Sequence, residues 1–324
     1  MRKLLLACAL APTLASVGIA SAQVYPSHPV TMIVSYAAGG SSDVLGRILA
    51  EGMRARIGQP VIIENVPGAS GSIGVGRVAR AAPDGYTVSL GNWSTHVVNG
   101  AIYPLQYDVL KDFEPVALLS KNPVLVVARK SMPANDLQGF IAWLRANPDK
   151  ASAGTAGAGS PQHVSGLLFQ NITGTRFQFV PYRSGALAMQ DLLSGQLDLL
   201  MDNPLYSLPQ VRAGGIKVYA VMSKSRMAGA PDIPTVDEAG LPGFYNSTWF
   251  AVWAPKGTPK QVIGKLNAAI VDTLADPGVR SRFAELAQEI FPPEQQTPEA
   301  LGAHQKAEIE KWWPIVKAAN INGE

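Results

Sequence analysis

The sequence predicts an α/β fold of two lobes, each a mostly parallel sheet flanked by helices. Short apolar runs alternate along the chain with segments in which apolar residues recur at helical spacing. At two places about 120 residues apart, a glycine-rich turn joins an apolar run to a helix-like segment. No repeat with a period of about 20 to 50 residues is present, which argues against a solenoid. Such alternation is typical of parallel strands joined by crossover helices.

The first part of the chain predicts three strands and two helices. The expected elements are, in order, a strand at 30–36, a helix whose apolar stripe runs from Val44 to Met53, a strand at 61–65, a helix containing Ile73, Val75 and Val78, a turn at 83–85 and a strand at 86–91. Gly58 is expected to end the first helix, because glycine adopts the left-handed conformation of a C-cap without a steric penalty.

The remaining elements continue the alternation. They are, in order, an apolar run at 123–128, a helix at 136–146, strands at 177–182 and 198–201 with a helix at 186–193 between them, strands at 217–222 and 247–253, a helix starting at Pro259, and final helical segments that include 298–313. Residues 247–253 are apolar at nearly every position, as expected of a strand buried on both faces. Trp249, Phe250 and Trp253 are therefore interpreted as core.

The chain is expected to pass between the lobes twice, first near residue 123 and then, on its return, near residue 224. Residues 23–122 and 225–324 would then form the first lobe, with residues 123–224 as a second lobe inserted into it. About 300 residues are enough to bury two sizeable cores.

The first 22 residues are interpreted as a secretory signal peptide. Two basic residues precede an apolar stretch, residues 4–22, that ends in the small residues typical of a cleavage site. No later stretch approaches the roughly 18 to 20 apolar residues that a membrane span needs. We therefore expect the mature chain, 23–324, to be exported and not to insert into a membrane. The only cysteine, Cys8, lies inside the signal, so no disulfide is expected.

Composition argues against a nucleic-acid partner and against a disordered chain. The formal net charge of +3 falls to +1 when Arg2 and Lys3 leave with the signal, and no cluster of basic residues stands out. Charged residues make up 16% of the chain and hydrophobic residues 47%, which is typical of a globular protein.

The sequence lacks the usual signatures of metal, nucleotide and catalytic sites. None of the four histidines has a His or Cys neighbour at metal-ligand spacing, and HExxH, GxSxG and Walker A motifs are absent. We therefore expect a binding protein without metal or cofactor, not an enzyme. The alternative is a periplasmic serine hydrolase, because Ser160 and His163 lie close in sequence, although a helix N-cap role for Ser160 is favoured.

The two glycine-rich turns are the candidate binding features. One spans residues 36–43 and the other residues 153–163, and a helix-like segment follows each. A strand that turns through glycine into a helix leaves backbone N–H groups pointing at open space, where the helix dipole adds partial positive charge. Either turn alone is explained as an ordinary loop, but two of them on two lobes would grip one anion from opposite sides. Gly40 is expected to allow close approach of the ligand or a positive φ.

Two aspartates near these features have two interpretations each. Asp43 either complements the dipole of the first helical turn, or orients a hydrogen-bond donor or binds an amine at the cleft. Asp202 follows a buried strand, and a residue at that end of a strand often lies at the ligand crevice of an α/β sheet. The sequence Asp-Asn-Pro that begins there is also typical of a turn.

A series of short motifs runs through nearly the whole mature chain. They are Tyr-Ala-Ala-Gly-Gly-Ser-Ser-Asp at 36–43, Asn-Val-Pro-Gly-Ala-Ser-Gly at 65–71, Pro-Asp-Gly-Tyr-Thr at 83–87, Gly-Thr-Ala-Gly-Ala-Gly-Ser-Pro-Gln-His at 154–163, Val-Pro-Tyr-Arg-Ser-Gly at 180–185, Gln-Asp-Leu-Leu-Ser-Gly-Gln at 190–196 and Ala-Pro-Lys-Gly-Thr-Pro at 254–259. In this order they resemble the Bug/TctC family, the periplasmic solute receptors of tripartite tricarboxylate transporters.

The resemblance implies a two-lobed periplasmic binding protein fold that closes by a hinge on a small organic carboxylate. In the family, two loops hold the carboxylate through backbone N–H groups, hydroxyls and ordered water. The matching residues are Tyr36, Ala38, Gly39, Gly40, Ser41 and Asp43 in the first loop and Thr155, Gly157, Ala158, Ser160 and His163 in the second. More variable positions read the distal end of the ligand, for which we nominate Trp93, Ser94, Thr95 and Asp202.

The implied partners are the carboxylate and the membrane permease subunits of the transporter, with the receptor itself a monomer. A receptor that feeds a signalling system would use the same fold, so sensing stays an alternative to uptake. Tyr36 stands where many members have Phe, and its hydroxyl either binds the ligand or points to water. The sequence does not identify the ligand, because the loops read only the shared carboxylate.

Overall fold

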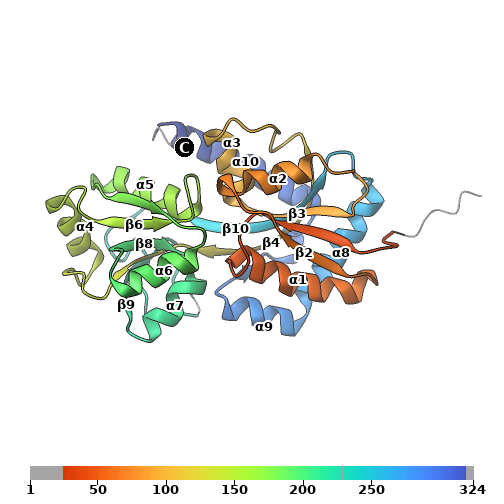
Figure 1. The fold of residues 1–324 in the computed structure, drawn as a ribbon. Coiled ribbons are helices and arrows are strands. Elements are labelled where there is room, and N and C mark those ends of the chain that lie inside the picture. The colour runs from red at the N-terminus through yellow and green to blue at the C-terminus, as the bar shows by residue number, and fades with distance from the viewer. Residues whose placement is uncertain (1–24, 228, 319–324) are drawn as a thin grey trace, which may run out of the picture.

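The computed structural model describes residues 25–227 and 229–318, which form two lobes, each built on one sheet (Figure 1). The predicted signal peptide, residues 1–22, lies outside the described residues. In the first lobe the strands are β1 (Val30–Val34), β2 (Val61–Asn65), β3 (Thr87–Asn92), β4 (Phe113–Pro123), β10 (Ser247–Pro255) and β11 (Glu289–Ile290). In the second lobe they are β5 (Leu125–Arg129), β6 (Ser152–Thr155), β7 (Gln178–Pro181), β8 (Leu199–Asp202) and β9 (Ile216–Val221).

Helices cover both faces of each sheet. The first lobe contains α1 (Ser41–Ile57), α2 (Ser72–Ala79), α3 (Asn99–Ile102), α8 (Lys260–Ala275), α9 (Pro277–Glu285) and α10 (Pro298–Ala318), with the short turns η1 (Ala69–Gly71), η2 (Ser94–Val98) and η3 (Pro293–Gln295). The second lobe contains α4 (Leu137–Ala146), α5 (Pro161–Thr173), α6 (Gly185–Ser194) and α7 (Pro204–Arg212). In Figure 1, α2, α3 and α10 lie above the first sheet and α1 and α9 lie below it.

Both sheets are mixed, with strand orders β11-β4-β10-β3-β1-β2 and β7-β6-β8-β5-β9 among the described residues. The strands joined by crossover helices are parallel: β1 pairs with β2 and β3, and β6 pairs with β7 and β8. The strands β10 and β5 are antiparallel to their neighbours. The α/β prediction is confirmed. β5 and β10 are antiparallel to their neighbours because the chain enters each of these strands from the other lobe and not through a crossover helix, and β11 also pairs antiparallel with β4.

The core consists of four apolar clusters, one on each face of each sheet. The stripe predicted for the first helix is buried at Leu45, Ile48, Leu49 and Met53. As predicted, β10 is buried along nearly its whole length, because β3 and β4 flank it and helices cover both faces of the sheet. The buried aromatic residues of β10 are thus core and not pocket.

Three backbone segments lie side by side where the lobes meet. The chain leaves β4 and enters β5 through Val124, whose N–H donates to the Asn246 carbonyl at 3.2 Å. Asn246 N–H donates to the Met222 carbonyl at 3.1 Å, and Met222 N–H donates to the Val124 carbonyl at 2.8 Å. Between Met222 and Asn246 the chain still packs in the second lobe, with Val236 buried against its sheet. We therefore propose that the return crossing lies at Asn246, beyond the position near 224 expected from the sequence.

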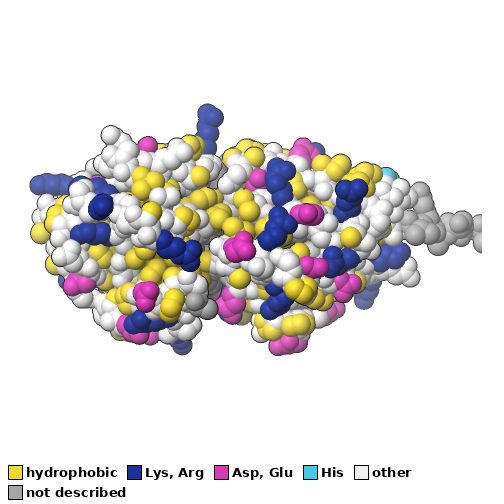
Figure 2. Space-filling model, turned by 90° about the horizontal axis from the view of Figure 1, so that it is seen from below, with side chains coloured by type: hydrophobic (Ala, Val, Ile, Leu, Met, Phe, Trp, Pro, Cys, Tyr) yellow, Lys and Arg dark blue, Asp and Glu magenta, His cyan; other side chains and the backbone are white. Residues whose placement is uncertain are grey.

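Charges on the surface are mixed in sign. Figure 2 shows Lys and Arg side chains interspersed with Asp and Glu side chains over the face that it presents. Among residues 25–227 and 229–318, no helix is both long and apolar enough to cross a bilayer. The same residues contain no cluster of three or more His, Cys, Asp or Glu side chains suited to a metal ion.

Candidate functional site

A small cavity of about 60 Å³ lies between the lobes. From the first lobe it is lined by Tyr36, Ala37, Gly40, Ser41, Ser42 and Asn92, from the second by Ala156, Pro161, Gln162, Arg183, Ser184, Gly185, Met201, Asp202, Asn203 and Tyr206, and from the crossing segments by Val124 and Thr248. Both lobes therefore contribute to one wall, so a molecule bound there would contact both.

Four helices begin at this cavity. The N-cap residues of α1, α6 and α7 are Gly40, Ser184 and Asn203, and all three line the wall. α5 contributes its first residue, Pro161. Gly40 has no side chain to cap α1, so N–H groups of the first turn of α1 are left for a ligand. Four helix dipoles add partial positive charge at one place, which favours an anion.

Among the described residues that line the cavity, Arg183 is the one cation. It is exposed and lies in the segment that leads into α6. A guanidinium can donate two parallel hydrogen bonds to a carboxylate. The sequence-based prediction missed Arg183, although the chain carries a signal for it. Arg183 and Ser184 stand between β7 and α6, and Ser184 accepts a hydrogen bond from the Leu187 N–H, as an N-cap does.

Asp202 is the one carboxylate of the described wall, and it is fully buried at the end of β8. Its Oδ2 accepts a hydrogen bond from the Ser207 hydroxyl at 2.5 Å, whereas Oδ1 has no partner among the described residues. Burial raises the pKa of Asp202 to about 7, because removing a carboxylate from water disfavours its charged form. Within the Asp-Asn-Pro sequence, Asn203 is the N-cap of α7 and accepts from the Leu205 N–H at 3.0 Å.

Hydrogen bonds to Asp43 hold the first glycine loop in its conformation. Gly39 has a φ of 80°, and its N–H donates to Asp43 Oδ2 at 2.9 Å. Arg47 donates to the same oxygen at 3.0 Å. Burial acts to raise the pKa of Asp43, but the hydrogen bonds from Arg47 and Gly39 outweigh it and hold the pKa below its usual range. Gly40 has extended backbone, with a φ of −75°, so the positive φ considered for it belongs to Gly39.

The second glycine loop contacts the first lobe directly. Tyr103 donates to the Ala158 carbonyl at 2.5 Å, and Ser94 donates to the Gly159 carbonyl at 2.7 Å. The Ser70 hydroxyl also donates to the Ala158 carbonyl. The two lobes are thus joined at the loop itself.

Ser160 and His163 are not arranged as a nucleophile and its base. Ser160 is fully buried and is the N-cap of α5, accepting from the His163 N–H at 3.4 Å. The His163 Nδ1 accepts from the Gly159 N–H at 3.1 Å. Burial lowers the pKa of His163 to about 4, so the ring is neutral at pH 7. The favoured N-cap role is confirmed.

Of the residues nominated after β3, Trp93 and Thr95 are buried in the first lobe, whereas Ser94 contacts the second lobe through the Gly159 carbonyl. Trp93 is fully buried and packs edge-on against Trp312 at a ring separation of 4.8 Å. Thr95 accepts from the Asn92 N–H at 2.9 Å. It is Asn92, the last residue of β3, that lines the cavity. The general rule that ligands bind beyond the carboxyl ends of strands could have identified it.

The cavity thus brings together only part of the predicted site. Of the nominated residues, Tyr36, Gly40, Ser41 and Asp202 line the wall. The others are not among its lining residues: Ala38, Gly39, Asp43, Trp93, Ser94, Thr95, Thr155, Gly157, Ala158, Ser160 and His163. The Tyr36 hydroxyl donates to the Ser70 carbonyl at 3.4 Å, so it has a partner within the first lobe.

Proteins of known family resemble this chain over most of its length. A family model described as the tripartite tricarboxylate transporter family receptor matches residues 45–321. A UPF0065 protein from the TAR-I ttuE-ttuC′ intergenic region of Agrobacterium vitis is 39% identical over 91% of this chain and 85% of its own length. Protein BugT of Bordetella pertussis is 35% identical over 94% of both chains.

Solved structures show the same fold. The periplasmic binding protein BugD is 38% identical, with a TM-score of 0.87 over 93% of this chain and 100% of its own. MatC from Rhodopseudomonas palustris, solved with bound malate, is 38% identical, with a TM-score of 0.86 over 90% of this chain and 100% of its own. A second R. palustris protein, Rpa4515 with adipate, is 32% identical, with a TM-score of 0.86 over 92% of this chain and 99% of its own.

Proposed function

This chain belongs to the tripartite tricarboxylate transporter receptor family, a family of solute-binding receptors and not of enzymes, and from that premise we propose that it captures a small organic carboxylate for a membrane permease. The observation that carries the proposal is the convergence of four helix N-termini and Arg183 on one cavity. N-terminal partial charges and a guanidinium together favour an anion with planar oxygen atoms.

The ligands of two structural neighbours support a carboxylate over other anions. MatC is described with bound malate and Rpa4515 with adipate, and both ligands are dicarboxylates. These proteins are 38% and 32% identical to this chain, so we take from them the chemical class of the ligand and not its identity.

We place the mature receptor in the periplasm as a monomer that delivers its ligand to permease subunits. The family description and the predicted signal peptide at residues 1–22 support this location and this partner.

Binding is proposed to act through closure of the lobes about the segments at Val124, Met222 and Asn246. The contact of Tyr103 with Ala158 joins the lobes in the closed form. A carboxylate held by α1 on one lobe and α6 on the other would favour the closed form, because it can contact both lobes only in that form. Small-angle X-ray scattering should show a smaller radius of gyration with ligand. An unchanged radius, in a sample shown to be open without ligand, would rule out closure.

Thermal unfolding of the purified mature chain with a carboxylate panel tests the proposal. Succinate, malate, adipate and citrate form the panel, and maltose is the neutral control. A carboxylate present at about 100 times its Kd should stabilise the chain by about 2.7 kcal/mol, which corresponds to a rise in Tm of about 5 °C. Maltose should leave the Tm unchanged. A rise with maltose and none with the panel would contradict carboxylate binding.

A further inference from the structure

We propose that Asp202 selects dicarboxylates that carry a hydrogen-bond donor, a hydroxyl or an ammonium group, on the chain between their carboxylates. This inference rests on the proposed function, since it assumes that the cavity holds a carboxylate. It goes further because it states which carboxylates the receptor prefers and which atom makes the choice.

One oxygen of Asp202 is buried without a partner. The side chain is fully buried, and Ser207 holds Oδ2 at 2.5 Å. Oδ1 has no hydrogen-bond partner among the described residues, although Asp202 belongs to the cavity wall. A buried acceptor left unsatisfied is costly, so a donor is expected to meet it in the functional complex.

Burial raises the pKa of the Asp202 carboxylate, and the Ser207 hydroxyl and the Asn203 backbone act to lower it, but Oδ1 has no hydrogen-bond partner among the described residues. Asn203 caps α7 through its own side chain, with the Leu205 N–H at 3.0 Å. Arg183, the cation of the described wall, has no ion pair with Asp202 within 4.0 Å. The bond to Ser207 fixes the orientation of the carboxylate but leaves Oδ1 free.

The groups around Asp202 differ from it in chemistry. Its neighbours in the wall are chiefly donors or the positive ends of dipoles: the N-terminal ends of four helices, the guanidinium of Arg183 and the hydroxyls of Ser41 and Ser184. Because α5 and α7 begin with Pro161 and Pro204, which have no N–H, these two helices contribute through their dipoles. These groups would bind the carboxylates of a ligand. An ionised Asp202 only accepts hydrogen bonds and repels a carboxylate. It would therefore bind a donor group that lies between the two carboxylates of the ligand.

Three dicarboxylates of the same chain length test the inference. Succinate, malate and aspartate carry hydrogen, hydroxyl and ammonium at one position. By isothermal titration calorimetry at pH 8, malate and aspartate should bind the wild-type chain about tenfold or more tightly than succinate, because succinate leaves Oδ1 unpaired. In Asp202→Ala the three affinities should fall within about threefold of one another. The matched control is Asp191→Asn, which changes an aspartate of α6 outside the wall and should preserve the wild-type preference.

A second variant keeps the test valid if Asp202→Ala does not fold. Asp202→Asn has the same shape and an acceptor oxygen but no charge, so it should keep some preference for malate and lose the preference for aspartate. Equal binding of succinate, malate and aspartate to the wild-type chain would overturn the inference and leave carboxylate binding intact. A preference that persists in Asp202→Ala would also overturn it. If no dicarboxylate binds the folded wild-type chain, the proposed function fails as well.

Discussion

Two hollows lie between the lobes, on opposite faces of the crossing strands, and they differ in size and in the groups that line them. The cavity described above has a volume of about 60 Å³, and the second, which we call the rear groove, has about 690 Å³. Val124 and Thr248 face the cavity, whereas their chain neighbours Pro123 and Ser247 face the groove. Successive residues of a strand point to opposite faces, which explains how one pair of segments lines both.

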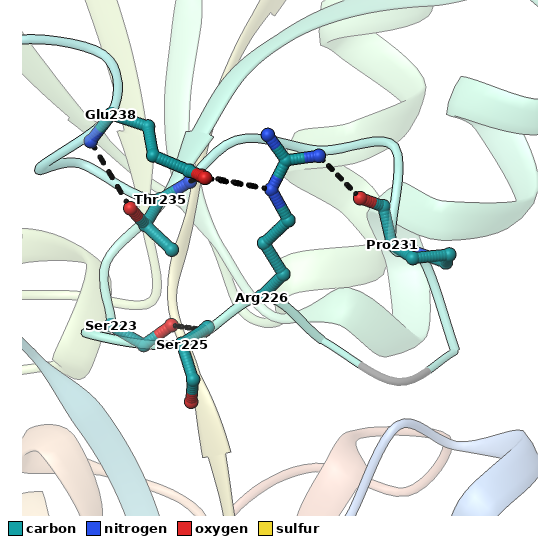
Figure 3. A network of polar contacts seen from close by, with 6 residues as sticks. All are labelled: Ser223, Ser225, Arg226, Pro231, Thr235 and Glu238. Carbon is teal, nitrogen blue, oxygen red and sulfur yellow. Dashed lines mark hydrogen bonds and ion pairs between the residues drawn. The ribbon is translucent and has the colours of Figure 1, made fainter.

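The rear groove is lined by charged side chains that have other partners. It is formed by Lys121, Pro123, Met222, Ser223, Lys224, Ser225, Arg226, Met227, Gly229, Tyr245, Asn246, Ser247, Ala284, Ala287, Gln288, Glu289, Glu308, Lys311 and Trp312. Lys121 lies 3.5 Å from Glu289. Figure 3 shows Arg226 between the Glu238 carboxylate and the Pro231 carbonyl, where it braces residues 223–238.

Volume is therefore a poor guide to a carboxylate site in this protein. The rear groove is larger, but its cations are side chains on flexible stems, and two of them already have anionic partners. The cavity offers backbone N–H groups that the fold holds in place, so little ordering is needed when an anion binds. We therefore expect substitutions at the cavity to change affinity strongly and those at the groove to change it weakly.

The largest effect is expected for Gly40→Val. A Cβ at Gly40 would lie 3.2 Å from the Ala37 carbonyl oxygen, and the branched side chain would extend into the cavity where α1 begins. We expect dicarboxylate affinity to fall more than 100-fold, by about 3 kcal/mol or more. Gly40 is buried, so thermal unfolding is measured alongside to show that the variant is folded. Calorimetric titration measures it. Gly264→Val, in open space on α8, is the control, and normal binding by folded Gly40→Val would show that the cavity is not the site.

A smaller loss is expected for Arg183→Ala. Removing a charge-assisted hydrogen bond costs about 1.5–3 kcal/mol, so affinity should fall roughly 10- to 100-fold. Arg176→Ala serves as the control, because Arg176 pairs with Asp149 on the surface and should not affect binding. If both variants bind like the wild-type chain, the helix N-termini suffice and the guanidinium plays no part.

The pH dependence of the free energy of unfolding reports on His163, in the glycine loop that joins the lobes. Burial lowers the pKa of His163 to about 4, below the usual value near 6.5. Between these values the unfolded chain binds a proton that the folded chain does not, so this residue makes the chain less stable as pH falls from about 7 to 4. His163→Asn retains an acceptor for the Gly159 N–H but does not titrate there.

We expect His163→Asn to lose about 1–2 kcal/mol less stability than the wild-type chain on acidification from pH 7 to pH 5. Denaturant unfolding at several pH values provides the measurement. Above pH 7.5 the two chains should show the same pH dependence. Parallel curves down to pH 5 would mean that His163 is not the titrating group. The buried Asp202, whose pKa is raised to about 7, acts in the opposite direction in both chains, so the difference between them isolates His163.

The smallest effect is expected in the rear groove, for Ala284→Trp. Ala284 is exposed on α9 and lines the groove opposite the second lobe. If the lobes open about the crossing segments, the groove narrows, so an added indole should oppose opening and tighten ligand binding about threefold. Titration and scattering of the ligand-free chain check this together, with Ala284→Ser as the control. A large loss of affinity in Ala284→Trp would contradict the expectation that the cavity, and not the rear groove, binds the ligand.

Local signals in the sequence predict the elements well where the pattern is regular. Gly58 has the left-handed φ of 72° expected of a C-cap, and Ser160 caps α5. The apolar pattern does not predict β4, because Glu114, Pro115 and Lys121 interrupt it. The strand is nevertheless mostly buried, since β10 and β11 pair with it from distant parts of the chain.

The sequence by itself determined the alternation of strands and helices and the two glycine turns that precede α1 and α5, because periodicity and turns depend on residues a few positions apart. Only the tertiary structure decided that α6 and α7 also begin at the cavity, that Arg183 and Asp202 share its wall, and that Trp93, Ser94 and Thr95 do not line it. These outcomes depend on how residues 222–246 fold back beside Val124, which sets one lobe against the other. Contacts between residues so far apart in the chain leave no periodic signal in the sequence.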